Sequence, residues 1–506
     1  MTNAVCLSNN IFDRNFLTKK EYIEMIENFI RTVEIIGDNL KTDELLHLDT
    51  IPTLVAFGIM EENEEIYDIE KILGKTITKK LLESIYIVNK FDLLNYNEIA
   101  SYHYITRNQV AKRENELEKP TLIDLFCGSG GLSLGFTQAG FKVVLSNDIE
   151  KAAIRTYAFN HPEIDGSKIL FGGIESITSN IRNYIDDKVD VIIGGPPCQG
   201  FSMANRQRII DDPRNILYKH YVECVKQVTP KFFIMENVKG MKAVADQVVE
   251  DFNNGIDIKY DISFKVLNAK DFGIPQNRER LIYIGVRHDI ALLHKVTADD
   301  IFNSIEMKYV DSNVSLMDAI KDLKSLEASR IKYSTTKGSK ASGYIIDEKS
   351  KVKETDYVRR INHDKAAKLV FNHKARYNND RDIEIFGRML PGDQSDSPRI
   401  ADIMPYSHRN HMFKDKYYKL KPDGICKTIT AHMKFDCNMY IHPLQARGLT
   451  PREAARVQTY PDSYFFLGPY TKTYQQIGNS VPPLMANRIA RGVVDYVKHP
   501  TSSSLQ

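Results

Sequence analysis

The stretch "EKPTLIDLFCGSGG" (residues 118–131) decides the fold, because a short apolar strand runs directly into a glycine-rich turn. Gly128, Gly130 and Gly131 stand between this strand and an apolar helical stretch, where backbone without side chains can approach a ligand. The same turn also arises simply to let a helix pack closely on a strand. The stretch therefore predicts a strand, a turn and a helix of an α/β protein, and it leaves the ligand question open.

The downstream sequence repeats this alternation of apolar strands and helical stretches. The further strands are expected at "KVVLSND" (142–148), "KILFGG" (168–173), "VDVIIGG" (189–195), "KFFIMEN" (231–237) and "RLIYIGV" (280–286). The pattern is typical of a doubly wound, mostly parallel sheet with helices on both faces. Asp148 ends the second strand, 20 residues beyond Gly128, where it is suited to accept both ribose hydroxyls of a nucleoside cofactor.

The N-terminal part differs from this α/β region in both pattern and charge. Apolar residues in 20–36 recur at steps of three and four, which predicts an amphipathic helix ended by Gly37. Residues 1–118 hold 13 Lys and Arg against 21 Asp and Glu, which leaves a net charge of −8 there and +10 on the rest. We expect an acidic helical domain. Its role stays open between binding a protein partner, regulating the enzyme and making an extra DNA contact. The segment 97–113 fits a helix-turn-helix or, more simply, a helical hairpin used for packing.

The basic character of the remaining chain indicates a polyanionic partner such as nucleic acid, although a solvated basic surface is an equally good interpretation. Residues 305–445 are polar and irregular, which predicts a second, smaller domain. The sequence has no run of about 18 uncharged apolar residues and no secretory signal, so a cytoplasmic protein is expected. The six cysteines are scattered without a C-x-x-C pair, which argues against disulfides and against a metal site.

Four chemically active side chains are expected at one edge of the sheet. Cys198 follows two prolines in "GGPPCQGFS", and Glu236 follows the next strand in "FFIMENV". Arg278 and Arg280 lead into the last strand, on one face of it. Each has an ordinary interpretation alone: a buried thiol, a helix cap, solvated arginines. Because ligands bind at the carboxyl ends of strands in open α/β sheets, their convergence beside a nucleoside turn predicts a catalytic site.

In this order the sequence resembles the C5-cytosine DNA methyltransferases. The resemblance covers roughly residues 119–300 and 446–495. It rests on the blocks "DLFCGSGG", "GGPPCQGFS", "ENV", "QNRER", "RGLTPREAARVQTYPDSY" and "QQIGNSVPP". The resemblance implies a class I methyltransferase fold, with a Rossmann-like doubly wound sheet, an inserted target-recognition domain and the N-terminal helical domain. It also implies S-adenosyl-L-methionine as cofactor and double-stranded DNA as partner, with a monomer acting on DNA.

The family's chemistry carries over onto the active side chains. Cys198 as a thiolate would add to C6 of a cytosine flipped out of the duplex, which makes C5 nucleophilic toward the methyl group. Glu236 would hold protonated N3 and the exocyclic amine, with Arg280 on O2 and Arg278 in support. The resemblance also implies a cofactor set and a DNA set. The cofactor set is Phe126, Gly128, Gly130, Asp148, Ile174, Leu217, Asn479 and Val481, and the DNA set is Ser202, Thr428 and Thr430.

One position departs from the family pattern. Relatives often carry an acidic residue that touches the adenine amino group, and this chain has Gly173 there, beside Ile174. The polar contact to adenine must then come from elsewhere.

The block order implies four parts: a helical domain (1–118), a catalytic and cofactor-binding domain (119–304), a target-recognition domain (305–445) and a C-terminal part that completes the catalytic domain (446–506). The expected function is a DNA (cytosine-5-)-methyltransferase that protects host DNA in a restriction-modification system. Two alternatives remain: a tRNA cytosine-5 methyltransferase, and a catalytically silent DNA-binding relative. The target sequence and the presence of a partner endonuclease do not follow from the residues.

Overall fold

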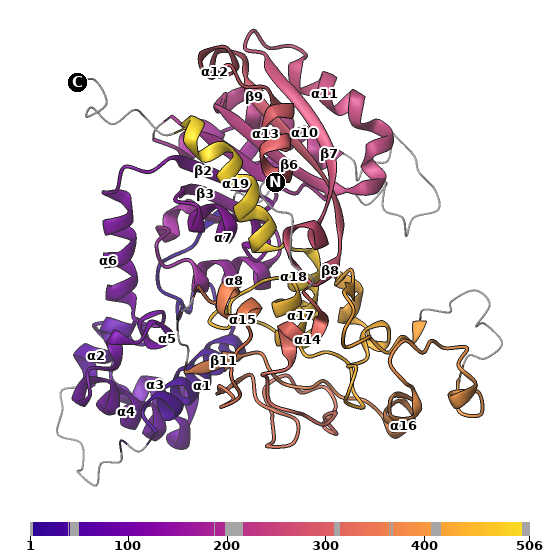
Figure 1. Ribbon diagram of the computed structural model, residues 1–506. Coiled ribbons are helices and arrows are strands. Elements are labelled where there is room, and N and C mark those ends of the chain that lie inside the picture. Colours follow the sequence, from indigo (N-terminus) through magenta and orange to yellow (C-terminus); the bar gives the residue numbers. More distant parts are fainter. Residues whose placement is uncertain are drawn as a thin grey trace.

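A twisted eight-stranded sheet lies in the upper part of the protein as drawn in Figure 1. The computed structural model describes residues 4–38, 40, 50–186, 188–197, 216–307, 314–363, 365, 368–405 and 416–497. In spatial order the strands are β1 (Val5–Cys6), β4 (Ile169–Phe171), β3 (Lys142–Asp148), β2 (Thr121–Leu125), β5 (Val191–Gly194), β6 (Phe232–Val238), β9 (Glu279–Arg287) and β7 (Tyr260–Asn268). The five strands from β4 to β6 are parallel, and β1, β9 and β7 are antiparallel to their neighbours.

Helices cover both faces of the sheet, as a doubly wound fold requires. Along β6, Phe232 and Ile234 face one hydrophobic cluster while Phe233 and Met235 face the other. The first cluster is completed by α7 (Gly131–Gln138), α8 (Lys151–Asn160), α13 (Ala298–Met307) and α19 (Pro483–Val497). The second is completed by α9 (Glu175–Thr178), α10 (Ile216–Val228) and α11 (Ala245–Asn253). The predicted α/β fold is therefore confirmed, and all six expected strands are present; β1 and β7 were not predicted.

A second lobe is built from described residues between 314 and 479 and lies below the sheet in Figure 1. Its elements are α14 (Leu316–Ile320), α15 (Asp356–Ile361), α16 (Asp380–Arg388), α17 (Pro451–Val457), α18 (Tyr470–Asn479) and the hairpin of β10 (Ile346–Glu348) with β11 (Leu369–Phe371). Its main hydrophobic cluster joins Leu316 and Ile320 to Leu449, Tyr460 and Ile477. Chain on both sides of residue 445 thus shares one core. A short parallel pairing of β12 (Cys426–Lys427) with β8 (Gln276–Asn277) connects this lobe to the sheet domain.

The N-terminal module, defined here as the described residues between 4 and 115, forms a helical body beside both other parts (Figure 1). Its helices are α1 (Lys19–Ile36), α2 (Thr50–Phe57), α3 (Ile66–Leu73), α4 (Lys75–Lys90), α5 (Asn97–Ala100) and α6 (Tyr104–Asn115). Helix α1 matches the amphipathic helix predicted over 20–36, and a capping box between Thr18 and Glu21 starts it. The α5–α6 segment turns buried Arg107 toward α8, which favours the hairpin interpretation over a DNA reader.

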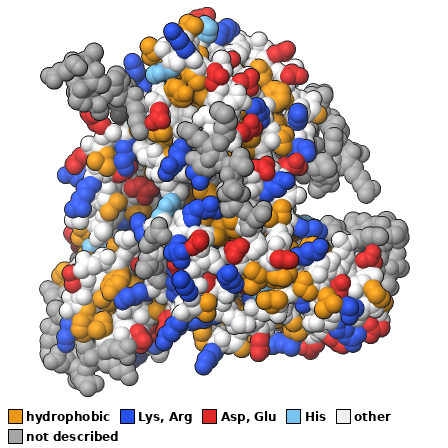
Figure 2. Space-filling model, in the orientation of Figure 1, with side chains coloured by type: hydrophobic (Ala, Val, Ile, Leu, Met, Phe, Trp, Pro, Cys, Tyr) orange, Lys and Arg blue, Asp and Glu red, His pale blue; other side chains and the backbone are white. Residues whose placement is uncertain are grey.

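Charged side chains of both signs are interspersed on the face drawn in Figure 2, with hydrophobic side chains between them. Within the described residues, no helix is both long enough and apolar enough to cross a membrane.

Candidate active site

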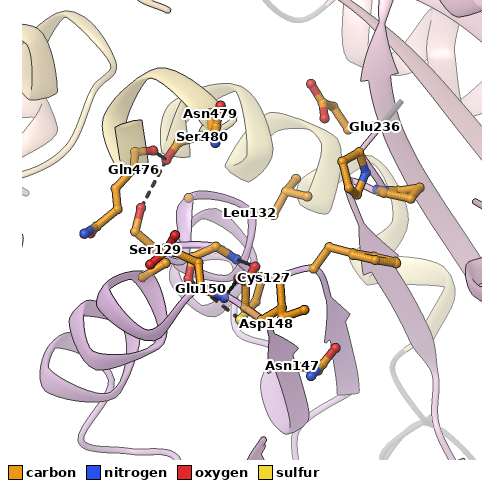
Figure 3. Close-up of a pocket in the computed structure, with 18 of the residues that line it drawn as sticks. Cys127, Ser129, Leu132, Asn147, Asp148, Glu150, Glu236, Gln476, Asn479 and Ser480 are labelled. Carbon is orange, nitrogen blue, oxygen red and sulfur yellow. Dashed lines mark hydrogen bonds between the residues drawn. The ribbon is translucent and has the colours of Figure 1, made fainter. Parts of the chain in front are cut away.

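A cavity of about 650 Å³ opens at the carboxyl ends of the parallel strands β2, β3, β5 and β6. Its wall includes the ends of these strands, the start of α10 and the C-terminal end of α18 (Figure 3). Seven of the eight residues predicted to bind the cofactor line it: Phe126, Gly128, Asp148, Ile174, Leu217, Asn479 and Val481. Glu236 and Arg280 line the same cavity, so it brings the nucleoside turn and the charged pair together.

The glycine turn needs its glycines for two different reasons. Gly128 and Gly130 have φ angles of +55° and +88°, a backbone region that side chains disfavour. A Cβ atom on Gly128 would meet nothing within 4 Å, which leaves open space for a ligand over the backbone. A Cβ atom on Gly130 would come within 2.7 Å of the Tyr464 hydroxyl, and Gly130 does not line the cavity. Gly130 therefore lets the second lobe approach the turn.

Asp148 is held in one orientation at the end of β3. Its two carboxylate oxygens accept hydrogen bonds from the backbone N–H groups of Gly128 at 2.8 Å and Glu150 at 2.7 Å. Burial raises the pKa of the Asp148 carboxyl, and these two N–H donors act against that rise. The carboxylate thus sits between the glycine turn and the start of α8, with lone pairs left for a polar ligand.

Ile174, the N-cap residue of α9, and Leu217, in the first turn of α10, form part of the apolar wall. Gly173 precedes Ile174, and the Glu175 carboxylate lies over it: a Cβ atom on Gly173 would be 2.5 Å from Oε2 of Glu175. Glu175 also lines the cavity. An acidic group is thus present near the departure at position 173, although it comes from a different residue.

Glu236 lies across the cavity from Asp148 (Figure 3). It forms a hydrogen-bonded ion pair with Arg280, which also lines the cavity. Nε of Arg280 lies 2.7 Å from Oε1 of Glu236, and both side chains are largely buried. The other carboxylate oxygen lies above Gly195, where a Cβ atom would approach within 2.9 Å. The side-chain amide of Asn237 donates to the carbonyl of Pro196 at 3.0 Å, which ties the end of β6 to the proline turn. The pair is therefore fixed from β6 and β9 and faces the cavity.

Arg278 lies behind this pair and does not line the cavity. Its fully buried guanidinium donates to the carbonyl oxygens of Ile429 at 2.6 Å, Gly478 at 3.1 Å and Ser480 at 2.7 Å. Burial lowers its pKa, and the neighbouring Arg280 charge lowers it further. Arg278 thus joins the sheet domain to two segments of the second lobe.

Thr428 and Thr430 lie at the same junction, outside the cavity wall. The Thr428 hydroxyl donates to the carbonyl of Asn277 at 2.5 Å, and the Thr430 hydroxyl lies 3.1 Å from that of Tyr440. The other two predicted site residues, Cys198 and Ser202, lie outside the described residues. The described chain ends before them at Pro197, which itself lines the cavity.

Sequence reasoning missed a group of polar residues that α18 contributes. Gln476 is buried, its amide nitrogen donates to the carbonyl of Leu467, and its Oε1 has no partner among the described residues. Lys472 pairs with Glu150 at 2.6 Å, and both line the cavity. Gln476 stands in the block "QQIGNSVPP", so the motif indicated this turn, but it did not indicate which side chain has an unpaired acceptor atom. The described residues contain no group of three or more His, Cys, Asp or Glu side chains suited to a metal ion.

Comparison with known proteins agrees with this geometry. The sequence matches the family described as C-5 cytosine-specific DNA methylase over residues 121–495. It is 33% identical over 402 residues to the type II methyltransferase M.DdeI of Desulfomicrobium norvegicum, covering 75% of this chain and 89% of that one. It is also 33% identical over 384 residues to M1.HphI of Haemophilus parahaemolyticus, covering 74% and 86%. Among solved structures, a putative DNA modification methyltransferase encoded within an E. coli prophage superposes with a TM-score of 0.56 at 27% identity, covering 75% of this chain and all of that one.

Proposed function

This chain belongs to the C-5 cytosine-specific DNA methylase family and is a DNA (cytosine-5-)-methyltransferase of the restriction-modification type, and from that premise we propose how its pocket works. The methyl donor is S-adenosyl-L-methionine, and the acceptor is C5 of a cytosine flipped out of a specific site in duplex DNA. The observation that carries the proposal is the single cavity shared by Asp148 and the Glu236–Arg280 pair.

The cavity suits a nucleoside cofactor. Its volume of about 650 Å³ falls within the usual range for such ligands. Asp148 offers carboxylate lone pairs to ribose hydroxyls, and Ile174 and Leu217 offer apolar surface to a base. The backbone of Phe126, Gly128, Asn479 and Val481 would hold the amino-acid end, while Gly130 keeps the turn in shape. When bound, the cofactor supplies an electrophilic methyl group on a sulfonium sulfur.

The base-binding residues prepare the cytosine to accept that methyl group. The Cys198 thiolate adds to C6, and the electron pair moves into the ring, which makes C5 a nucleophile. Glu236 holds protonated N3 and the exocyclic amine, and Arg280 binds O2, so that the charge entering the ring is stabilised. Once C5 carries the methyl group, loss of its proton and departure of the Cys198 thiolate restore the aromatic ring. Arg278 supports Arg280 without entering the cavity, because its hydrogen bonds to three carbonyl oxygens hold the start of β9 in place.

The second lobe would recognise the target site. We propose the division into residues 1–118, 119–304, 305–445 and 446–506 on the order of the motifs, with 305–445 reading the DNA and Thr428 and Thr430 contacting it near the junction. Ser202 would contact phosphate in the segment that follows Cys198. The protein would act as a monomer on DNA in the cytoplasm and protect host DNA from a partner endonuclease.

The first test uses tritiated S-adenosyl-L-methionine with separate DNA and RNA substrates. We expect label to enter duplex DNA only, and we expect Cys198→Ala to abolish it. Label in tRNA alone would favour the tRNA methyltransferase alternative, and no label in either would favour a silent DNA-binding relative. Bisulfite sequencing of plasmid DNA from cells with and without the protein would then give the target site and the modified position.

A second test addresses the covalent step directly. Duplex DNA that carries 5-fluorocytosine at the target position cannot lose fluorine from C5, so the Cys198 adduct should persist. We expect a denaturation-resistant protein–DNA complex in the presence of the cofactor, and none with Cys198→Ala. A saturating reaction at the correct site without such a complex would rule out the proposed covalent mechanism.

A further inference from the structure

The N-terminal module lies before the start of the family match at residue 121, and it contacts α8 and β4, the elements that adjoin two turns on the nucleoside side of the cavity. The first is the turn 148–150 between β3 and α8, and the second is the turn 172–175 between β4 and α9. Both turns line the cavity. Three sets of contacts join the module to the elements that hold these turns.

The first set lies at the start of α8. The Glu21 carboxylate on α1 accepts from Nζ of Lys151 at 3.0 Å and from Nη1 of Arg155 at 2.8 Å, one turn further along α8. Arg155 is largely buried, and although burial alone would raise the pKa of Glu21, the Thr18 backbone N–H and Arg155 lower it to about 2. The residue before Lys151 is Glu150, whose backbone N–H donates to Asp148. The module therefore holds the helix whose first N–H group orients the ribose-binding carboxylate.

The second set lies at the other end of the same helix. Arg107 on α6 is 1% exposed, and its guanidinium donates to the carbonyl oxygens of Ala158 and Phe159 in the last turn of α8. These carbonyls have no hydrogen-bond partner inside the helix. A cation placed there satisfies them and interacts favourably with the negative end of the helix dipole. Nε of Arg107 also donates to the carbonyl of Asn9 at 2.9 Å, which links α8 to the module's first residues.

The third set lies at the edge of the sheet. Strand β1 of the module pairs with β4, with Val5 opposite Phe171 and Cys6 opposite Leu170. The backbone N–H of Leu7 donates to the carbonyl of Ile169 at 3.0 Å, which extends the pairing. Strand β4 leads directly into Gly172 and the second cavity turn. The module thus covers the otherwise open edge of the strand that ends at this turn.

We propose that the N-terminal module positions the turns 148–150 and 172–175 and thereby sets the affinity for the nucleoside methyl donor. Glu21 and Arg107 are the positioning residues, and they act through α8 without touching the ligand. This inference rests on the proposed function, because it takes the cavity as the S-adenosyl-L-methionine site. The same module also contacts the second lobe, where Nζ of Lys368 donates to the Tyr96 hydroxyl at 3.0 Å. That contact supplies a control that does not involve α8.

The test measures binding of S-adenosyl-L-homocysteine by calorimetry, together with methylation kinetics, on the full chain. Glu21→Gln removes both ion pairs with α8 and keeps an acceptor for the capping box. We expect roughly three- to tenfold weaker binding, an equal rise in KM for the methyl donor, and unchanged kcat and unchanged KM for DNA. Thr18→Ala disturbs the cap of α1 but keeps both ion pairs. Tyr96→Phe removes the hydrogen bond from Lys368 and keeps the aromatic ring beneath its ammonium group. Both controls should bind S-adenosyl-L-homocysteine as the wild type does.

Arg155→Met tests the same contact from α8, and the double variant should bind no more weakly than the weaker of the two single variants, because the two residues share one interaction. Hydrogen–deuterium exchange adds a readout without turnover: peptides covering residues 148–150 should exchange faster in Glu21→Gln than in Thr18→Ala. Wild-type affinity in Glu21→Gln would overturn the inference, as would a change confined to KM for DNA, which would make the module a brace between lobes. A wild-type protein that does not bind S-adenosyl-L-homocysteine would instead overturn the proposed function.

Discussion

Arg456 in the second lobe and Arg280 in the cavity both pair with carboxylates, and they differ in what remains for a ligand. Arg456 is completely buried and donates to Asp462 through Nε and Nη2, to Asp322 through both terminal nitrogens, and to the carbonyl of Ala319. Arg280 makes one ion pair, with Glu236, and donates to the carbonyl of Glu279. All five N–H donors of Arg456 bind groups within the protein, whereas Arg280 still faces the cavity.

The difference shows how similar chemistry can serve structure in one place and recognition in another. Burying a charge costs free energy unless hydrogen bonds and opposite charges within the protein satisfy it fully. The Arg456 network meets this condition and leaves no donor for a ligand. An incomplete set at a cavity wall keeps donors and acceptors in a fixed geometry for a ligand that completes it. We therefore expect substitutions of the two arginines to separate stability from activity.

The largest expected effect is that of Arg456→Met on stability. Removal of the guanidinium leaves Asp322 buried without its cation and leaves Asp462 with only Lys349, at 3.5 Å, and breaking a buried pair in this way typically costs about 3–5 kcal/mol. Denaturant unfolding followed by circular dichroism should show the free energy of unfolding reduced by that amount. Arg456→Lys provides the control, because it keeps the charge but loses the planar arrangement of five donors. Its free energy of unfolding should lie between those of the wild type and Arg456→Met. A methionine variant as stable as the wild type would contradict the structural role of the network.

The second effect is that of Arg280→Met, which should lower activity while leaving the fold intact. Loss of one positioned cation from a charge-stabilising site costs about 10²- to 10³-fold in kcat. Glu236 faces a cavity that water can enter, so its carboxylate remains solvated and the loss of stability should stay near 1 kcal/mol. The measurements are single-turnover methylation of duplex DNA and denaturant unfolding of the same preparation. A variant that lost stability as Arg456→Met does would remove the distinction between the two regions.

The two regions also differ in how far the sequence could predict them. Glu236 and Arg280 were predicted to meet at one edge of the sheet. Glu236 lies near the end of β6, and Arg280 reaches the same edge because it lies at the start of β9, which runs antiparallel to β6. Arg456 stands in a motif that the family resemblance covers, yet its partner Asp322 lies 134 residues away in an irregular segment. Nothing in the local sequence around Asp322 indicates that pairing, because it depends on tertiary packing.

Length and register explain the remaining misses. Strand β1 has two residues, and it exists only because β4 offers an open edge far along the chain. Gln476 was not predicted because its neighbours Asn479 and Val481 carry the recognisable motif. That its Oε1 atom is buried without a hydrogen-bond partner can be known only from the folded structure. Local pattern thus predicts regular elements well, and it does not report which polar atoms remain unpaired after packing.

The third effect concerns two buried aspartates, one with an arginine and one without. Arg456 holds the pKa of Asp462 below its usual value against the cost of burial, whereas burial without a cation raises the pKa of Asp124, beneath the glycine turn, to about 7. Because the folded pKa of Asp124 is raised, its contribution to stability is complete below about pH 4 and is lost as the pH rises through 7. The slope is at most about 1.4 kcal/mol per pH unit.

Asp124→Asn should reduce this slope, since the amide can still accept the hydrogen bond from the Ser133 hydroxyl and does not ionise. The free energy of unfolding measured from pH 4 to 7 would show a flatter profile for the variant than for the wild type. An identical slope in both proteins would mean that Asp124 ionises at its ordinary pKa.

The smallest effect is expected for Arg388, which repeats the Arg456 arrangement at the surface. Its guanidinium also reaches two carboxylates, Asp402 at 2.8 Å and Glu384 on the preceding turn of α16, but all three groups are exposed to solvent. Water and salt screen such pairs, and ordering the long side chains opposes the attraction. Arg388→Ala should therefore leave the denaturation midpoint unchanged at physiological ionic strength, with any small loss at low salt disappearing as salt is added. A clear destabilisation that persisted in high salt would show that the number of carboxylates matters more than burial, and it would undermine the contrast between Arg456 and Arg280.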